Sequence, residues 1–239
     1  MIQNVKTRAT AVVDEGLRSY MIMVYNYMAG GLVFTGLAAF LVLNTPLIGL
    51  FFTIAPTGQA VGLSPFGWIA LFAPLILIFM FGNIISRGTP KQAQAAFWSF
   101  SAVMGISLAP ILVMYTGASI TRVFLITSAT FGAMSIYGYT TKKDLSAWGS
   151  FLFMGLIGVI IASIVNIFMM SPAIYWAVSF IGVFVFVGLT AYDTQRIREM
   201  YYQTHQGNVT QVAIFGALKL YLDFINLFIM LLRFLGDRR

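Results

Sequence analysis

The chain has 239 residues, of which 59% are hydrophobic and only 9% are charged, with a formal net charge of +7. Soluble domains carry about 25% charged residues, so this composition excludes a soluble globular protein and indicates an integral membrane protein. Cysteine is absent, which excludes disulfide bonds, thiolate metal sites and cysteine nucleophiles. In a membrane protein Lys and Arg report on topology, so we expect no nucleic-acid partner.

The first 21 residues are predicted to form a cytosolic N-terminal arm. They contain no apolar core of the signal-peptide kind. Instead they carry five charged residues, which are Lys6, Arg8, Asp14, Glu15 and Arg18. Residues 22–239 are predicted to form one membrane domain, because no polar stretch among them is long enough for a soluble domain.

Seven apolar segments follow the arm, each about as long as the ~20 residues that a helix needs to span a bilayer. Their length and the lack of regularly alternating strands favour helices over barrel strands. We therefore predict an all-α integral membrane protein with seven transmembrane helices. The expected spans are residues 22–44, 66–86, 95–115, 119–139, 148–170, 173–195 and 213–235.

The connections between these spans alternate in charge. Lys and Arg occur in the arm and in residues 87–94, 140–147 and 196–212, whereas residues 45–65, 116–118 and 171–172 contain neither. This alternation follows the positive-inside rule and places the N-terminus in the cytosol. The arginines after the seventh segment favour its return to the inside, whereas its length favours a full crossing, and we expect a crossing.

The seventh segment carries polar residues along one face. Lys219, Asp223, Asn226, Met230 and Arg233 are separated by steps of four, three, four and three residues, which trace one seam of an α-helix. A charge at the bilayer centre costs about 2.5–3.5 kcal/mol even on a lenient insertion scale. We therefore expect this seam to face protein or water, and the helix to be surrounded by other helices.

Only two carboxylates fall inside the apolar segments, Asp193 and Asp223. An acid inside a membrane segment is a candidate functional residue by default. Structural roles remain open, because Asp193 could be solvated or pair with Arg196, and Asp223 could pair with Lys219 one turn earlier. The two acids could instead meet, since their helices are consecutive. In a low dielectric they would then share one proton and change charge near physiological pH.

Asp193 and Asp223 can touch only if they lie at similar depths in the membrane, which the expected spans do not give. With the spans as given, Asp193 lies near the inner face and Asp223 lies about 15 Å deeper. The last helix must therefore begin higher than expected. Arg87 ends the second span on the same inner side, where it could act as a counter-ion for Asp193 or extend to the interface as an ordinary flanking arginine.

No arrangement of residues for catalysis is evident in the sequence. It has no nucleophile–base pair, no His–Glu metal spacing and no phosphate-binding loop. Two membrane acids would also suit an intramembrane aspartyl protease, but neither acid lies in the Gly-x-Gly-Asp element typical of such enzymes. We therefore predict that the protein is not an enzyme and holds no cofactor.

Several stretches resemble the Bax inhibitor-1 (TMBIM) family in its bacterial branch. They are Tyr192-Asp193-Thr194-Gln195 after Gly188, Leu220–Phe228 before Leu231-Leu232-Arg233, Gly105–Pro110 and Lys142–Leu145. The resemblance implies a seven-helix fold whose last helix is central and wrapped by the other six. It also implies a pH sensor made by Asp193 and Asp223, an arginine at Arg87 that pairs with Asp193, and a pH-dependent calcium leak in the bacterial inner membrane.

Two functions from different classes are consistent with these features. The favoured one is a pH-gated calcium leak, in which Asp193 and Asp223 transiently bind Ca²⁺ through the oxygen ligands that this cation prefers. Lys219 and Asn226 would then form a supporting polar seam. The alternative is a membrane interaction protein that regulates a membrane-embedded protease or a stress response. The expected partners are the lipid bilayer, Ca²⁺ and protons, with a membrane protease added in the alternative.

Overall fold

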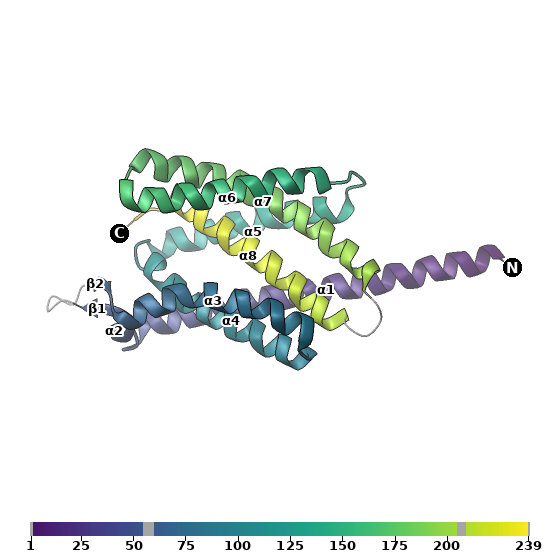
Figure 1. Cartoon of the computed structure of the whole chain (residues 1–239), viewed down its shortest axis with the longest axis horizontal. Helices are drawn as coiled ribbons and strands as arrows, with labels where there is room; N and C mark the ends of the chain where they lie inside the picture. The colour runs from purple at the N-terminus through teal and green to yellow at the C-terminus, as the bar shows by residue number, and fades with distance from the viewer. Residues whose placement is uncertain (1, 55–59, 205–208, 239) are drawn as a thin grey trace. The chain divides into compact units, whose positions relative to one another are not determined.

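The computed structural model describes residues 2–54, 60–204 and 209–238, without the side chains of residues 2–14, 54, 60, 61, 85 and 86. Within these ranges the chain forms eight α-helices and one short β-hairpin (Figure 1). In chain order they are α1 (Ile2–Asn44), α2 (Ile48–Phe51), β1 (Phe52–Ile54), β2 (Ala60–Leu63), α3 (Pro65–Arg87), α4 (Pro90–Leu112), α5 (Gly117–Thr140), α6 (Ser146–Met169), α7 (Pro172–Gln203) and α8 (Val209–Leu235).

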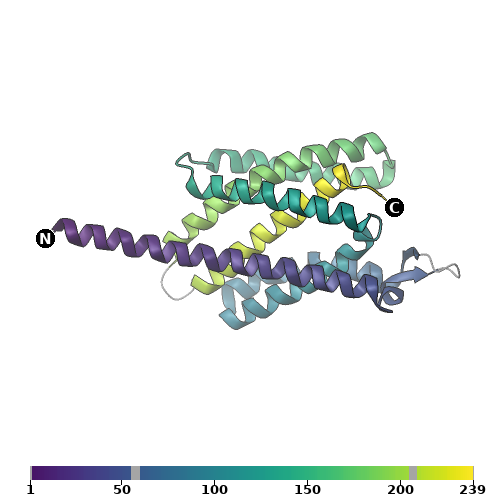
Figure 2. The ribbon, with the colours of Figure 1, turned by 180° about the vertical axis from the view of Figure 1, so that it is seen from behind.

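Seven of the described helices are long and apolar enough to cross a membrane, namely α1 from Glu15 onward and α3 to α8. This confirms the predicted all-α membrane fold with seven transmembrane helices. The expected arm is helical as well, because α1 runs as one helix of 43 residues from Ile2 to Asn44 (Figure 2). The division of the chain at residue 21 into an arm and a membrane domain stays a prediction.

The connection between the first two spans contains a small β-hairpin, which the sequence pattern does not predict. β1 and β2 are antiparallel, with Phe52 opposite Leu63. Phe52 is buried and packs with Val42 of α1 and Ala109 of α4, so the hairpin is held by apolar contacts at its base. Strands this short lack the alternating pattern from which they could be predicted.

Polar caps explain where several helices begin. Ser64 accepts a hydrogen bond from Gly67 N at the start of α3, and Thr116 accepts one from Ser119 N at the start of α5. Thr89 and Gln92 form a capping box at the start of α4. Such caps satisfy backbone N–H groups that have no partner inside the helix, and each contributes about 1 kcal/mol.

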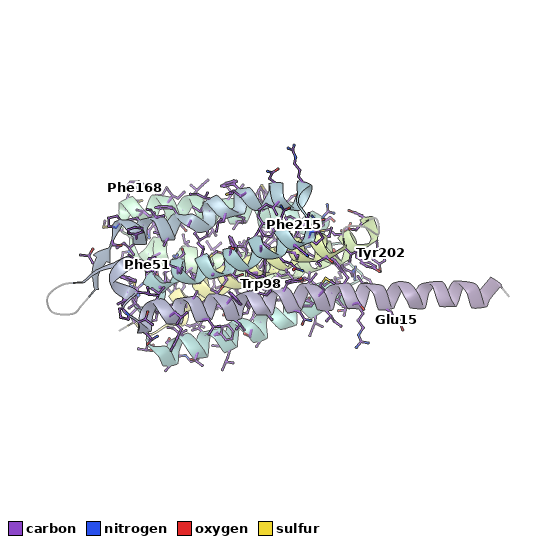
Figure 3. The ribbon with its side chains drawn as sticks, turned by 90° about the horizontal axis from the view of Figure 1, so that it is seen from below. Glu15, Phe51, Trp98, Phe168, Tyr202 and Phe215 are labelled. Atoms are coloured by element: carbon purple, nitrogen blue, oxygen red, sulfur yellow. The ribbon has the colours of Figure 1, made fainter. Side chains whose placement is uncertain are left out.

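The chain forms two compact units, which are described separately. The first contains Met1–Met114 and Gln203–Leu218, and the second contains Tyr115–Tyr202 and Lys219–Arg239. The boundary therefore falls inside α8, after Leu218. In the first unit α1 and α3 pack against α4. Trp98 of α4, labelled in Figure 3, lies so close to Gly30 of α1 that a Cβ atom there would come within 2.7 Å of the indole ring.

The second unit is held together by close approaches at glycines of α5, α6 and α7. A Cβ atom on Gly138 of α5 would lie 2.2 Å from the carbonyl oxygen of Ala191 in α7. A Cβ atom on Gly188 of α7 would lie 2.5 Å from the side chain of Leu152 in α6. Small residues let transmembrane helices approach closely, and Gly138 lets α5 pack directly on the backbone of α7.

α8 is the most buried of the seven membrane helices. In its most apolar stretch 67% of the residues are buried, whereas the other six helices range from 11% to 39%. Within the polar seam Asp223 and Met230 are buried, whereas Lys219, Asn226 and Arg233 are half-buried, so the environment expected for the whole seam stays a prediction. The central position of α8 among six wrapping helices stays a prediction.

The prediction of a loop at residues 196–212 is wrong, because most of these residues are helical. α7 continues to Gln203 and α8 begins at Val209. The extension of α7 is anchored by Ile197, which is fully buried, and by Arg198, which donates a hydrogen bond to Tyr139 O. Asp193 therefore lies about three turns before the end of α7, and Asp223 about four turns after the start of α8, which reduces the expected offset between them from about 15 Å to about 6 Å.

Candidate functional site

The polar seam of α8 faces one side of α7 within the second unit. Lys219 reaches Asp193, and Met230 packs on Gly182, where a Cβ atom would lie 2.9 Å from the Met230 sulfur. Residue numbers rise along α8 while they fall along α7, so the two helices run antiparallel. Along the seam Asp223 and Met230 are buried, whereas Lys219 keeps about a third of its side chain exposed.

Asp193 and Asp223 are brought together by this antiparallel packing. Asp193 is 9% exposed and Asp223 is 6% exposed. Their carboxyl groups lie within hydrogen-bonding range of each other and also repel each other when both are charged. Lys219 Nζ lies 3.2 Å from Asp193 Oδ1 and also attracts the charge of Asp223. The two buried acids and the partly exposed Lys219 therefore form one cluster.

The Asp223 carboxyl has an unsatisfied oxygen in this cluster. Asp223 Oδ2 is buried and receives no hydrogen bond from any described residue. The group beside it is the Asp193 carboxyl, which can only accept hydrogen bonds while it is ionised. A proton on either acid would convert this repulsion into a hydrogen bond. With both acids ionised the cluster has one excess negative charge, and with one proton bound it is neutral.

The structure distinguishes between the alternatives that the sequence left open. Asp193 is neither solvated nor paired with Arg196, because Arg196 NH1 lies 3.6 Å from Glu199 Oε2 and Asp193 pairs with Lys219. Lys219 does interact with Asp223 along α8, but its hydrogen bond goes across to α7. Lys219 thus bridges the two acids.

The Asp193–Asp223 pair alone does not make a resident metal site. Across residues 2–54, 60–204 and 209–238, no three His, Cys, Asp or Glu side chains gather closely enough to hold a metal ion. Ca²⁺ takes six to eight oxygen ligands, so two carboxylates offer a passing cation a partial shell.

Arg87 lies at the end of α3 in the first unit and has an exposed side chain. Together with Asn83 and Gln92 it lines a pocket of about 480 Å³. The adjacent Gly88 carbonyl accepts a hydrogen bond of 2.7 Å from Gln211 Nε2, which ties α3 to the start of α8. The pairing of Arg87 with Asp193 stays a prediction.

Asn226 takes part in the seam in a different way from its charged neighbours. Its Nδ2 donates a hydrogen bond of 2.9 Å to Leu222 O in the preceding turn of α8. The amide is half-buried and satisfies part of its hydrogen-bonding capacity within its own helix. Its role as support for an ion gate stays a prediction.

Gln195 lies near the Asp193–Asp223 pair and acts as a positioning residue. The sequence places it in a motif but predicts no role for it. Its Nε2 donates to Lys143 O, and its Oε1 accepts from Leu145 N, both at 2.8 Å. The side chain is buried, and it fixes the connection between α5 and α6 to α7 just beyond Asp193. Two of the stretches that carried the resemblance, around Asp193 and at Lys142–Leu145, are therefore physically joined.

We expect Gln195→Leu to destabilise the second unit. Leucine has a similar volume but leaves Lys143 O and Leu145 N without their partner, and each unsatisfied buried group costs about 1–3 kcal/mol. Denaturant or thermal unfolding of the purified protein in detergent would measure this loss. Gln203→Leu is the matched control, because Gln203 is exposed on the same helix; equal losses in the two variants would contradict the clamp.

Comparisons with known proteins extend these observations. A family model described as "Inhibitor of apoptosis-promoting Bax1" matches residues 17–239. An uncharacterized protein of Rickettsia prowazekii is 47% identical over an alignment of 245 residues that covers 100% of both chains. An uncharacterized protein of Caulobacter vibrioides is 43% identical over 235 residues, covering 97% of this chain and 94% of the relative. The inner membrane protein YbhL of Escherichia coli is 44% identical over 228 residues, 94% of each chain.

Proposed function

We propose that this chain, which belongs to the Bax inhibitor-1 family of membrane proteins, is a pH-gated cation leak whose main cargo is Ca²⁺. The observation that supports this proposal is the cluster of the buried acids Asp193 and Asp223 with Lys219. Buried acids in a membrane helix are costly unless they are paired, and they commonly mark ion pathways or proton relays. The proposal needs no enzyme chemistry and no cofactor.

The proposed gate works by competition for the carboxylate oxygens. When Asp193 and Asp223 are both ionised, Lys219 neutralises only one of the two charges, and the remaining charge attracts a cation. When the pair holds a proton, the cluster is neutral and offers Ca²⁺ little attraction. Arg87 is the second proposed competitor, as a counter-ion for Asp193 in the closed state.

The location that we propose is the inner membrane of a bacterium, with the N-terminus in the cytosol. The relative YbhL carries the name of an inner membrane protein. The basic residues of alternate connections support the orientation through the positive-inside rule. Placing a cysteine or a small tag at each terminus and testing its accessibility from outside intact cells would check the orientation.

Reconstitution in liposomes tests the proposed function. Purified protein would be inserted into vesicles that contain a Ca²⁺-sensitive dye, and Ca²⁺ entry would be followed from acidic to alkaline pH. We expect entry above that of protein-free vesicles, with a rate that rises as the acids lose their proton. Entry no faster than in protein-free vesicles, together with copurification of a stoichiometric membrane protease, would instead favour the interaction-protein function.

Lys219→Gln should increase Ca²⁺ entry severalfold at alkaline pH. The glutamine removes the ammonium that lies 3.2 Å from Asp193 Oδ1 and that competes with Ca²⁺ for this carboxylate in the proposed gate. The same liposome assay measures the change. Lys142→Gln is the control, since Lys142 is exposed in the connection between α5 and α6. Unchanged or slower entry in Lys219→Gln would contradict the competition.

A further inference from the structure

A pocket of about 310 Å³ lies in the second unit, where α6 turns into α7. Ser163 and Asn166 of α6, Tyr175 of α7 and Arg233 of α8 contribute its polar lining. Arg233 follows Asp223 by nearly three helical turns, or about 15 Å. The pocket is thus separate from the Asp193–Asp223 pair and plays no part in the gate proposed above.

Two guanidinium groups lie beside the Tyr175 ring, and one of them, that of Arg233, lines the pocket. The Arg233 guanidinium lies 5.5 Å from the centre of the Tyr175 ring, and that of Arg238 lies 5.3 Å from the same ring. Arg238 also donates a hydrogen bond of 2.9 Å to Tyr175 Oη. Both arginines are always protonated, so they give this end of the unit two positive charges.

These charges lack acidic partners among the residues that the structure describes. Neither Arg233 nor Arg238 forms an ion pair with a described carboxylate. The neighbouring acid, Asp237, is bound to Arg122 NH2 at 2.9 Å. Arg233 is half-buried and Arg238 is exposed, and an arginine without an acidic partner is suited to bind a phosphate or carboxylate beside it.

The rest of the pocket supplies hydrogen-bonding groups suited to an anion. Asn166 Oδ1 accepts from Ser171 N at 2.9 Å, which leaves the Asn166 NH₂ group to donate to an occupant. The guanidinium of Arg233 can donate two parallel hydrogen bonds to a phosphate, the geometry in which arginine binds such groups most strongly. No described acid lines the pocket to oppose an anion.

The surroundings of the pocket match the depth of lipid headgroups. Trp176 and Phe234, which follow the lining residues Tyr175 and Arg233 in sequence, are 55% and 36% exposed, and their ring centres lie 5.5 Å apart. Trp and Tyr concentrate where the hydrocarbon of a bilayer meets its headgroups. A phospholipid could therefore place its phosphate beside Arg233 and an acyl chain along these exposed rings.

We propose that Arg233, Asn166 and Tyr175 form a binding site for a phosphate group, with the headgroup of a phospholipid as its source. The site is independent of the proposed cation leak, so either can fail without the other. If this site binds phosphate, binding of the phospholipid should depend on the charge of Arg233 and on the open volume beside Ser163.

Ligand-dependent thermal unfolding of the purified full chain in a maltoside detergent tests this site. Three probes would be titrated, namely short-chain phosphatidylglycerol, inorganic phosphate, and a diacylglycerol of matched chain length without phosphate. A ligand that binds the folded state raises the unfolding temperature in proportion to its occupancy. We expect Arg233→Gln to weaken phosphatidylglycerol binding about tenfold or more. Ser163→Leu should weaken it by filling the pocket without changing the charge, and Arg196→Gln, at a distant arginine, should leave it unchanged.

Each outcome bears on the proposal. Stabilisation by phosphatidylglycerol that is lost in Arg233→Gln and Ser163→Leu supports a headgroup site, and a parallel effect of inorganic phosphate supports phosphate as the recognised group. Stabilisation by inorganic phosphate alone overturns the lipid as the source. An equal effect of diacylglycerol, or equal responses of wild type and both pocket variants, overturns the site.

Discussion

Asp223→Asn should leave Ca²⁺ entry into liposomes insensitive to pH. Asparagine has almost the same shape as aspartate but cannot gain or lose a proton, so the pair with Asp193 loses its switch. Lys219 then neutralises the one remaining acid, and the excess negative charge that attracts Ca²⁺ disappears at every pH. We expect entry to fall toward that of protein-free vesicles over the whole range, and Asp193→Asn should behave in the same way.

Asp144→Asn is the matched control for this experiment. Asp144 is exposed, and hydrogen bonds from Ser146 hold the pKa of its carboxyl below the ordinary value. It therefore stays ionised across the range in which the gate is expected to respond, and its replacement should change nothing. A normal pH response in both Asp193→Asn and Asp223→Asn would remove the basis for the gate.

Gly138→Ala should strongly destabilise the second unit. The added methyl group would lie 2.2 Å from Ala191 O, and a backbone atom cannot move aside as the end of a side chain can. Forcing extra volume into packed helices costs about 1–3 kcal/mol and sometimes more. Because α7 carries Asp193 close to this contact, the displacement should also slow Ca²⁺ entry. Unfolding in detergent and the liposome assay measure the two effects.

The same substitution at Gly132 should have the opposite effect on stability. Gly132 lies on α5 as well, but a Cβ atom there meets nothing within 4 Å. Alanine favours a helix over glycine by up to about 1 kcal/mol, so Gly132→Ala should be neutral or slightly stabilising. Equal destabilisation by both alanines would show that the contact with Ala191 does not limit packing.

The membrane spans could be predicted from sequence because a bilayer leaves few choices. A polar backbone must form its hydrogen bonds inside each spanning segment, so an apolar run of about 20 residues is almost certain to be a helix. The seam on α8 was informative for the same reason, since charges at regular helical steps indicate a face turned away from lipid. The burial of Asp223 follows from that logic.

The features that sequence missed depend on polar segments and on contacts between helices. Hydropathy finds only the apolar part of a helix, so the continuation of α7 through Ile197 to Gln203 was read as a loop. The sequence also does not determine which of the two acids, Asp193 or Asp223, Lys219 hydrogen-bonds. A long flexible side chain reaches both Asp223 along α8 and Asp193 across it, and only the antiparallel packing of α7 decides where its hydrogen bond goes.

The division of α8 between the two units has a consequence for biosynthesis. Asp193 precedes Lys219 by 26 residues. At about 5–20 residues per second a ribosome needs roughly one to five seconds to cover that interval. During this time the nascent chain carries the Asp193 carboxylate in α7, but Lys219, which pairs with it, has not yet been synthesised. Neither unit yet contains its part of α8. The translocon must therefore tolerate Asp193 without Lys219 each time the chain is inserted. In a chain truncated after α7 the acid never gains its partner, and quality-control proteases meet a chain with a permanently unpaired Asp193.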